Sequence, residues 1–400
     1  MNRTFSAFCM KSSHNRSCTG AAHTIKGRSI CVVLGLFLFS CSSLPHAHRG
    51  TLPGKERVSP VRYSIVCIID GDGDYLYHDS RGNPHRADEE ALVGAKMAAM
   101  RNPQAEVFIF HEKSRRRSLP FFPLRDGKFS YYRNGKLLAK ESYGRDQGQP
   151  PLNPEVDLYY KYRQESGQPL RAEEKPDLVR LFLYFGHEIP EFESSGYDAS
   201  RRDRKLTVNE LAEGLKRITH DSTKIDLVVL STCFGGTPHT IAAFSPCARY
   251  IIASPENLHL SYFDLHPFER LDTGLRDRDV SLFAKEYARH VFDRLKTEVQ
   301  TSVTVAVYDV DFVRGYVNAV ESVYDHDLNS FKGEAPASLE HCDCADNPAY
   351  MLPGMNEGVE VFYQPPRFGR SKHKNTHSGW ECWRVRELRA AVSHSAGEVR

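Results

Sequence analysis

Short apolar runs of strand length recur along this 400-residue chain, and segments with helical spacing separate them. This alternation is typical of β–α–β units, so it limits the chain to a doubly wound α/β core with a mostly parallel sheet. We expect a six-stranded sheet with helices on both faces. The expected strands are residues 63–69, 105–110, 178–185, 225–230, 250–253 and 303–308.

Two helix starts are well marked between these runs. Thr207 and Glu210 have the spacing of a capping box, and Thr237 is an N-cap residue followed by a proline at the first helical position. Other segments show the apolar periodicity of amphipathic helices. The expected helices are residues 87–100, 280–296 and about 311–324, together with those that begin after Thr207 and Thr237.

Two parts of the chain depart from the alternation. Asn134-Gly135 lies between two strand-like stretches, which predicts a small β-hairpin insert over residues 128–143. From about residue 326 the alternation stops, and only residues 359–363 look like a strand. We expect a main domain over residues 61–325 and an irregular C-terminal extension over residues 326–400 that packs on it.

The first 40 residues contain Lys and Arg but no acidic residue, and residues 30–39 are apolar. This run is shorter than the roughly 20 residues of a membrane-spanning helix, which favours a signal peptide over residues 1–40. Leu38-Phe39-Ser40-Cys41 resembles a bacterial lipobox, so Cys41 is the expected lipidation site and residues 41–60 the anchor and tether. We expect an exported, membrane-anchored lipoprotein on the periplasmic or cell-surface side; a plain cleaved signal is the alternative.

The net charge of +2 gives no electrostatic support for nucleic-acid binding. Export would allow some cysteines beyond the leader to pair, but their pairing cannot be read from the sequence. In the tail, His341, Cys342, Cys344 and Cys382 are candidates for a disulfide, for packed thiols or for zinc. Their Cys-x-Cys spacing is not typical of a zinc site, so we predict no metal site here.

Two reactive residue types stand at the ends of neighbouring expected strands. His187 follows the run 178–185, and Cys233 follows the run 225–230. Parallel strands bring their carboxyl ends to one edge of the sheet, where open α/β sheets bind ligands. A helix start at Thr237 favours the thiolate form of a nearby thiol. A thiolate beside an imidazole is typical of a cysteine hydrolase, and a buried cysteine with a hydrogen-bonded histidine is the structural alternative.

The stretch 206–265 resembles the clostripain family of caspase-like cysteine peptidases, peptidase family C11. The similar segments are LTVNELAEGL, IDLVVLSTCFGG and RYIIASPENL, and YSIVCIIDGDGDYLYHD resembles the first strand and turn of the family. The resemblance covers about residues 61–325 and implies a caspase-like fold. It implies Cys233 as nucleophile, His187 as catalytic histidine, and an oxyanion site formed by the backbone N–H groups of Cys233 and Glu188.

The resemblance also implies a peptide or protein substrate, with a family preference for Arg or Lys before the scissile bond that depends on an acidic pocket. Asp264 and Glu256 are weak candidates for substrate binding. The sequence requires no cofactor, and Ca²⁺ is suggested only by the family resemblance. Asp70, Asp72 and Asp74 lack the spacing of an EF-hand loop, which favours a solvated turn.

The chain departs from the family pattern beside both catalytic candidates. Glu188 follows the histidine where the family usually has glycine, and Ser231-Thr232 replaces the usual Asp-Ala before the cysteine. A carboxylate beside a developing oxyanion would oppose catalysis. The main hypothesis is a cysteine endopeptidase that forms a thioester; the alternative is an inactive caspase-fold lipoprotein that binds a protein or peptide. The basic residues 201–205 are either a solvated loop or a self-cleavage site.

Overall fold

The computed structural model describes residues 60–73, 75–78, 82–113, 126–144, 150, 152–166, 178–191, 206–219, 223–258, 262–275, 279–329 and 339–385. The expected signal peptide, Cys41, the tether up to residue 59, Asp74 and the basic run 201–205 lie outside these ranges. Within the described ranges, no helix is both long and apolar enough to cross a membrane.

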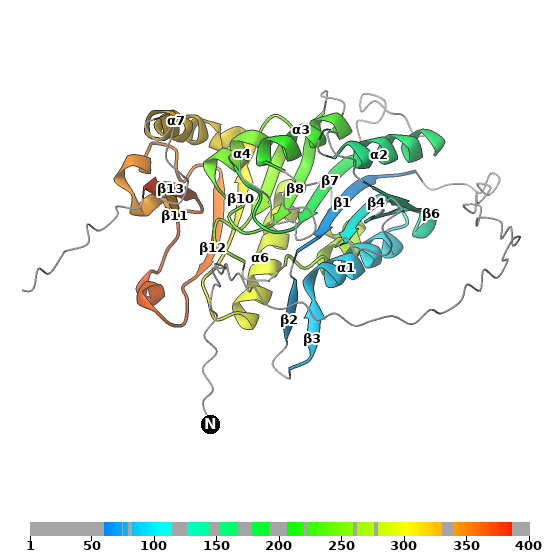
Figure 1. The fold of residues 1–400 in the computed structure, drawn as a ribbon, viewed down its shortest axis with the longest axis horizontal. Coiled ribbons are helices and arrows are strands. Elements are labelled where there is room, and N and C mark those ends of the chain that lie inside the picture. The colour runs from blue at the N-terminus through cyan, green and yellow to red at the C-terminus, as the bar shows by residue number, and fades with distance from the viewer. Residues whose placement is uncertain are drawn as a thin grey trace, which may run out of the picture. The chain divides into compact units, whose positions relative to one another are not determined.

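A mixed sheet forms the centre of the described chain (Figure 1). Its strand order is β12-β10-β9-β8-β7-β1-β4-β5-β6, and the five strands from β9 to β4 are parallel. The strands are β1 (Tyr63–Gly71), β4 (Ala105–Lys113), β5 (Gly127–Arg133), β6 (Lys136–Tyr143), β7 (Val179–Phe185), β8 (Ile225–Ser231), β9 (Ala248–Ala253), β10 (Val303–Asp309) and β12 (Val359–Gln364). Two small sheets pair β2 (Leu76–His78) with β3 (Pro84–Arg86) and β11 (Leu339–Asp343) with β13 (Glu381–Val385).

The main sheet has nine strands, so the expected number of six was too small. The predicted hairpin is present as β5 and β6, but it pairs with β4 and continues the sheet instead of forming a separate insert. Its turn residues Asn134 and Gly135 have φ values of 52° and 71°, which suits a tight hairpin turn. At the other side, β12 pairs with β10. These additions cover backbone groups that edge strands would otherwise expose.

Helices cover both faces of the sheet, as expected. Strand side chains alternate between the faces: on β7, Phe182 and Tyr184 join one core cluster, and Leu181 and Leu183 join the other. Helices α2, α3, α4 and α7 cover the first face, and α1 and α6 cover the second (Figure 1). The helices are α1 (Ala87–Arg101), α2 (Asn153–Glu165), α3 (Val208–Thr219), α4 (Pro238–Phe244), α5 (Leu271–Gly274), α6 (Val280–Glu298) and α7 (Val310–Asn329).

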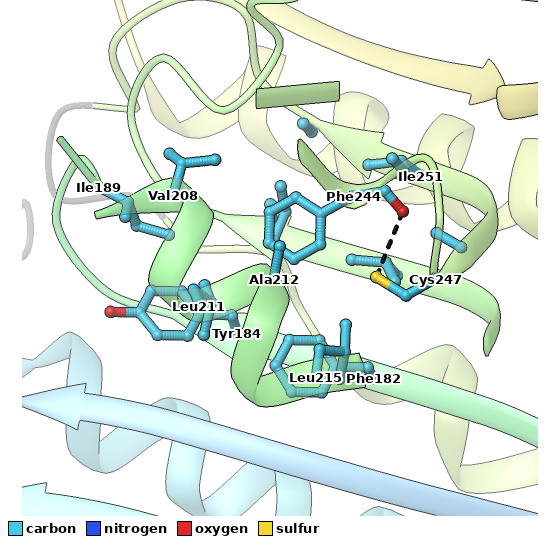
Figure 2. Packing of buried hydrophobic residues seen from close by; sticks show 14 of the residues in the cluster. Phe182, Tyr184, Ile189, Val208, Leu211, Ala212, Leu215, Phe244, Cys247 and Ile251 are labelled. Atoms are coloured by element: carbon cyan, nitrogen blue, oxygen red, sulfur yellow. Dashed lines mark hydrogen bonds between the residues drawn. The ribbon is translucent and has the colours of Figure 1, made fainter. Parts of the chain in front are cut away.

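Both predicted helix starts are confirmed. The Thr207 backbone N–H donates to the Glu210 carboxylate at 2.7 Å, and the Glu210 N–H donates to the Thr207 hydroxyl at 3.3 Å. At α4, the Thr237 hydroxyl accepts from the Thr240 N–H at 3.0 Å. Figure 2 shows the apolar stripe of α3, with Leu211 and Leu215, packed towards the sheet. These caps fix where the two helices begin, next to the loops that carry His187 and Cys233.

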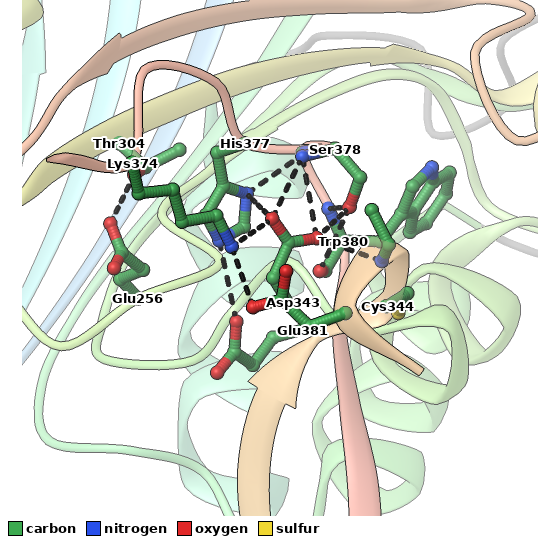
Figure 3. A network of polar contacts seen from close by, with 12 residues as sticks. Glu256, Thr304, Asp343, Cys344, Lys374, His377, Ser378, Trp380 and Glu381 are labelled. Carbon is green, nitrogen blue, oxygen red and sulfur yellow. Dashed lines mark hydrogen bonds and ion pairs between the residues drawn. The ribbon is translucent and has the colours of Figure 1, made fainter. Parts of the chain in front are cut away.

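The C-terminal extension is tied together by a disulfide and a buried polar network (Figure 3). Cys344 and Cys382 form the disulfide, with a Cα–Cα distance of 5.0 Å. The Asp343 carboxylate pairs with the Lys374 ammonium at 2.6 Å and accepts from the Ser378 hydroxyl at 2.5 Å. Burial alone would raise the pKa of Asp343, but the facing His377, with the Lys374 and Ser378 donors, holds it below its ordinary value. The boundary expected near residue 325 stays a prediction.

Candidate active site

The site lies where the strand order of the parallel sheet reverses. From β1 the chain passes to β4 on one side, and later to β7, β8 and β9 on the other. The carboxyl ends of strands at such a reversal are the usual ligand-binding position in open α/β sheets. Residues 186–191, which we call the histidine loop, leave β7 at this edge. Residues 232–237, the cysteine loop, leave β8 beside them, because β7 and β8 pair in parallel.

His187 is held by residues of the turn that follows β1. Its ring stacks on Tyr75 with ring centroids 4.5 Å apart, and Tyr75 also contacts Phe185 at 5.1 Å. Gly73 lies directly against the imidazole. A Cβ atom at Gly73 would come within 2.5 Å of His187 Nε2, so this position requires glycine. The acidic turn after β1 therefore orients the histidine, a role beyond the solvated turn expected from its sequence.

Cys233 contacts the loop that follows β9, residues 254–258, which we call the asparagine loop. The Cys233 thiol donates to Asn257 Oδ1 at 3.1 Å, and the Leu258 backbone N–H donates to Cys233 Sγ at 3.3 Å. Two backbone bonds join the same loops: Phe234 N–H to Glu256 O at 3.2 Å, and Gly236 N–H to Ser254 O at 3.1 Å. The N–H group that points at the sulfur favours the thiolate, whereas the bond that the thiol donates to Asn257 favours the protonated form.

Two residues of the cysteine loop, Phe234 and Gly236, have a constrained backbone. Phe234, directly after the cysteine, has φ 50°, a left-handed conformation that is rare for a bulky residue. A Cβ atom on Gly236 would collide with the Tyr308 hydroxyl and come within 2.9 Å of the Pro255 backbone. Close backbone approach thus requires glycine at position 236.

Cys233 differs from the other free cysteines of the described residues. Cys67, Cys247 and Cys342 are buried, whereas Cys233 is partly exposed. Burial raises the pKa of the Cys67 and Cys247 thiols to about 12 and that of Cys342 to about 11. Figure 2 shows Cys247 inside the core, where its thiol donates to the Phe244 carbonyl at 3.3 Å. These three are structural thiols, and Cys233 is the accessible one.

Glu188 directs its carboxylate towards the C-terminal extension. Its Oε1 atom lies 3.4 Å from Nε2 of His341, and its side chain is 25% exposed. His341 belongs to β11, and its ring also stacks on Phe234 with centroids 3.9 Å apart and planes 2° apart. The carboxylate that departs from the family pattern therefore has a partner.

The two weak substrate-binding candidates have partners of their own. Asp264 Oδ2 lies 3.0 Å from Nε2 of His290, and Asp264 Oδ1 accepts from the His266 N–H at 3.0 Å. Glu256 accepts a hydrogen bond from the Thr304 hydroxyl through its carboxylate. Both residues are thus engaged in local contacts near the cysteine and asparagine loops.

The three cysteines of the tail are one disulfide-bonded pair and one free thiol. Cys344 and Cys382 form the disulfide, and Cys342 is free. Within the described part of the chain, no group of three or more His, Cys, Asp or Glu side chains is placed to hold a metal ion. The disulfide interpretation of the tail is therefore the one that the geometry supports.

Several residues that shape the site were not singled out from the sequence. Gly73 and Tyr75 lie in the turn that resembles the first turn of the family, which was their only signal. Asn257 lies in the RYIIASPENL segment, but nothing there marks an amide that contacts the thiol. His341 was considered only as a metal ligand, and its contacts with the histidine loop and the cysteine loop come from the fold.

Replacing Asn257 by aspartate is expected to slow alkylation of Cys233 by iodoacetamide at neutral pH by about tenfold, because a carboxylate this close to the sulfur disfavours the thiolate. The rate profile would shift to higher pH. Mass spectrometry of Cys233 after timed alkylation at several pH values measures this. Asn318→Asp, an exposed position on α7, is the matched control. Identical profiles for Asn257→Asp and the unchanged protein would contradict the role given to Asn257.

Comparisons with known proteins find one family model and several solved structures that are similar to this chain. The model of the clostripain family, Peptidase C11, matches residues 186–342. No curated protein matches the chain. Among solved structures, iotapain, a secreted C11 cysteine protease from Bacteroides thetaiotaomicron, is 12% identical with a TM-score of 0.51, over 80% of this chain and 93% of that chain. This likeness supports a shared fold.

Two further solved structures are similar to the chain. One is an inactive zymogen C11 protease from Parabacteroides distasonis, 13% identical with a TM-score of 0.47 over 82% of this chain and 93% of that chain. The other is a secreted C11 cysteine protease from Bacteroides thetaiotaomicron in complex with an irreversible peptide inhibitor, 14% identical with a TM-score of 0.43 over 66% and 71%. The family match spans both the histidine loop and the cysteine loop. The clostripain family model thus matches the part of the chain, residues 186–342, that carries both His187 and Cys233.

Proposed function

We propose that this chain is an endopeptidase that uses Cys233 and His187 as a catalytic dyad. The thiolate of Cys233 attacks the carbonyl carbon of the scissile peptide bond, and the C–N bond breaks as His187 gives a proton to the leaving amine. A thioester then links the acyl part of the substrate to Cys233. His187 next takes a proton from water, the resulting hydroxide attacks the thioester, and the C–S bond breaks, which releases the carboxylic acid and restores the Cys233 thiolate and the protonated His187.

The observation that carries this proposal is the surroundings of the Cys233 sulfur. Among the free cysteines described, it alone is partly exposed, and it receives a backbone N–H from Leu258 at 3.3 Å. It follows β8, the strand that pairs with β7, and β7 ends before His187. A nucleophile and a proton carrier on neighbouring loops are what acyl transfer requires.

The oxyanion of the tetrahedral intermediate would be held by the backbone N–H groups of Cys233 and Glu188. The contact of the Glu188 carboxylate with His341 supports this assignment, because the carboxylate is engaged with the C-terminal extension. Phe234 N–H donates to Glu256 O and is therefore not an oxyanion donor.

Substrates with Arg or Lys before the scissile bond are the family-based expectation. Asp264 is the weak candidate for an acidic pocket, and its Oδ2 atom already contacts Nε2 of His290 at 3.0 Å. Ser231 lies at the position where the family often has aspartate. Its hydroxyl accepts a hydrogen bond from the Phe263 N–H at 2.9 Å and so holds the segment next to Asp264. The preferred residue before the scissile bond is therefore best determined with a panel of peptides that carry different charges at that position.

Export and lipid attachment at Cys41 remain part of the proposal. The Cys344–Cys382 disulfide supports an oxidising compartment, where such bonds persist. Two of the structural relatives are described as secreted. Radiolabelled lipid incorporation into the unchanged protein, and its loss in Cys41→Ser, would test the anchor.

The deciding experiment follows cleavage of fluorogenic peptides that carry Arg, Lys, Asp or Asn before the scissile bond, with and without Ca²⁺ and reductant. We expect turnover of the peptides with a basic residue before the scissile bond. We also expect an irreversible peptide inhibitor to attach to Cys233, and mass spectrometry locates the modified residue. Turnover only with an acidic residue would keep the peptidase and reject the basic preference. No turnover with any peptide, also after limited trypsin nicking, would favour the inactive binding protein.

A further inference from the structure

The two residues that directly follow the catalytic candidates both contact the same side chain, that of His341. Glu188 follows His187, and Phe234 follows Cys233. The His341 side chain touches both: its Nε2 atom lies 3.4 Å from Glu188 Oε1, and its ring stacks on the Phe234 ring with centroids 3.9 Å apart. A side chain from the C-terminal extension thus connects the histidine loop to the cysteine loop.

Phe234 has a conformation that must be held in place. A φ value of 50° is unfavourable for a phenylalanine and persists only when the surroundings impose it. The backbone bond from Phe234 N–H to Glu256 O at 3.2 Å supplies one restraint. The nearly parallel ring of His341, 2° from the plane of Phe234, supplies another. Since Cys233 is the preceding residue, this restraint acts on the nucleophile.

Glu188 needs a partner for a different reason. Its backbone N–H is the proposed oxyanion donor, and its own carboxylate would oppose a negative oxyanion if it turned towards the site. The His341 Nε2 contact holds the carboxylate on the side of the extension. With 13% of the His341 side chain and 25% of the Glu188 side chain exposed, solvent competes little with this contact.

The element that carries His341 makes further contacts with both loops. We use the name C-terminal hairpin for the antiparallel pair of β11 and β13, although β12 lies between them in the sequence. In this pair His341 lies opposite Trp383, and their ring centroids are 3.8 Å apart. Trp383 Nε1 donates to Glu191 Oε2 of the histidine loop at 2.6 Å. On the other side, the Glu381 N–H donates to the Gly236 carbonyl of the cysteine loop at 3.2 Å. The hairpin therefore contacts each catalytic loop at two points.

We propose that His341 is a positioning residue, which fixes the histidine loop and the cysteine loop relative to each other through Glu188 and Phe234. It takes no proton from the substrate and touches no reacting atom. The proposal rests on the proposed function, in which Cys233 and His187 carry the reaction. It makes the C-terminal hairpin part of the catalytic machinery.

The test compares His341→Ala, His341→Phe and the double variant His341→Phe/Glu188→Gln in the otherwise complete protein. We expect His341→Ala to lower kcat by about 10- to 100-fold with little change in KM, because misplaced catalytic groups slow the chemical step. His341→Phe keeps the ring contact but leaves Glu188 without its partner, so it recovers part of the loss. The double variant also removes the carboxylate charge and recovers most of it. His373→Ala, an exposed histidine of the same extension, is the control.

A second readout separates this inference from the proposed function. The rate at which iodoacetamide alkylates Cys233 reports the cysteine loop without any turnover, and thermal unfolding confirms that each variant is folded. A folded His341→Ala protein with unchanged kcat and unchanged alkylation would overturn the inference. If the unchanged protein cleaves no peptide, the proposed function fails, and alkylation alone then decides about His341. If His341→Ala does not fold, the double variant is compared with His341→Phe. Equal kcat and equal alkylation rates of Cys233 in these two variants would overturn the inference.

Discussion

Replacing Cys233 by alanine is expected to lower kcat/KM by more than about 10⁴-fold, the loss that follows removal of a nucleophile in hydrolases. The reason is that no other described free thiol can substitute for it. Cys67 and Cys247 are buried with pKa values of about 12, and Cys342 is buried in the C-terminal hairpin. Steady-state kinetics with the best peptide of the panel measures the effect.

The matched control for this variant is Cys247→Ala. Cys247 lies in the core between α4 and β9, so its replacement is expected to leave kcat/KM unchanged at a small cost in stability. Circular dichroism and thermal unfolding establish that both variants are folded. Residual activity of Cys233→Ala comparable to that of the unchanged protein would show that another group performs the reaction.

Removing the disulfide is the second change with a large expected effect. Cys344 and Cys382 are 38 residues apart, and closing a loop of that length stabilises a fold by about 3–4 kcal/mol. Cys344→Ala/Cys382→Ala should therefore unfold at lower denaturant concentration. It should also lose activity under conditions where it remains folded, because the hairpin that contacts both catalytic loops is loosened.

The double alanine variant is preferable to chemical reduction, since a reductant also acts on Cys233. Urea titration followed by fluorescence of the buried Trp380 gives the free energy of unfolding, and peptide cleavage below the transition gives the activity. Cys342→Ala, a neighbouring free thiol in the same hairpin, is the control. Equal midpoints and equal activity for the double variant and the control would contradict a role of the disulfide in either property.

The elements with a local signal were predicted well. The apolar runs of β1, β4, β7, β8, β9 and β10 and the caps at Thr207 and Thr237 depend on neighbouring residues, so the sequence shows them directly. Helix α2 was missed, because its N-cap residue is Leu152, which has φ 60° and supplies no side-chain cap. It also buries Glu155 and Arg163, which hides its apolar stripe. The larger sheet was missed because pairing of β12 with β10 depends on residues far apart in the sequence.

The residues of the candidate site also fall into those with a local signal in the sequence and those without one. His187 and Cys233 could be predicted because each follows a strand, and parallel strands place such residues at one edge. The residues around them could not. Asn257 contacts the thiol across 24 positions of sequence, and His341 contacts Glu188 across 153. A carboxylate that looks unfavourable beside His187 in the sequence is thus balanced by a residue that only the folded chain brings near.

The late position of the C-terminal hairpin has a consequence for how the protein is made. Trp383 contacts Glu191 across 192 positions of sequence. A ribosome adds residues from the N-terminus, so His187 and Cys233 both emerge long before the strands that hold their loops. A nascent chain therefore carries both side chains without the hairpin contacts, and these contacts form only after β13 has been translated.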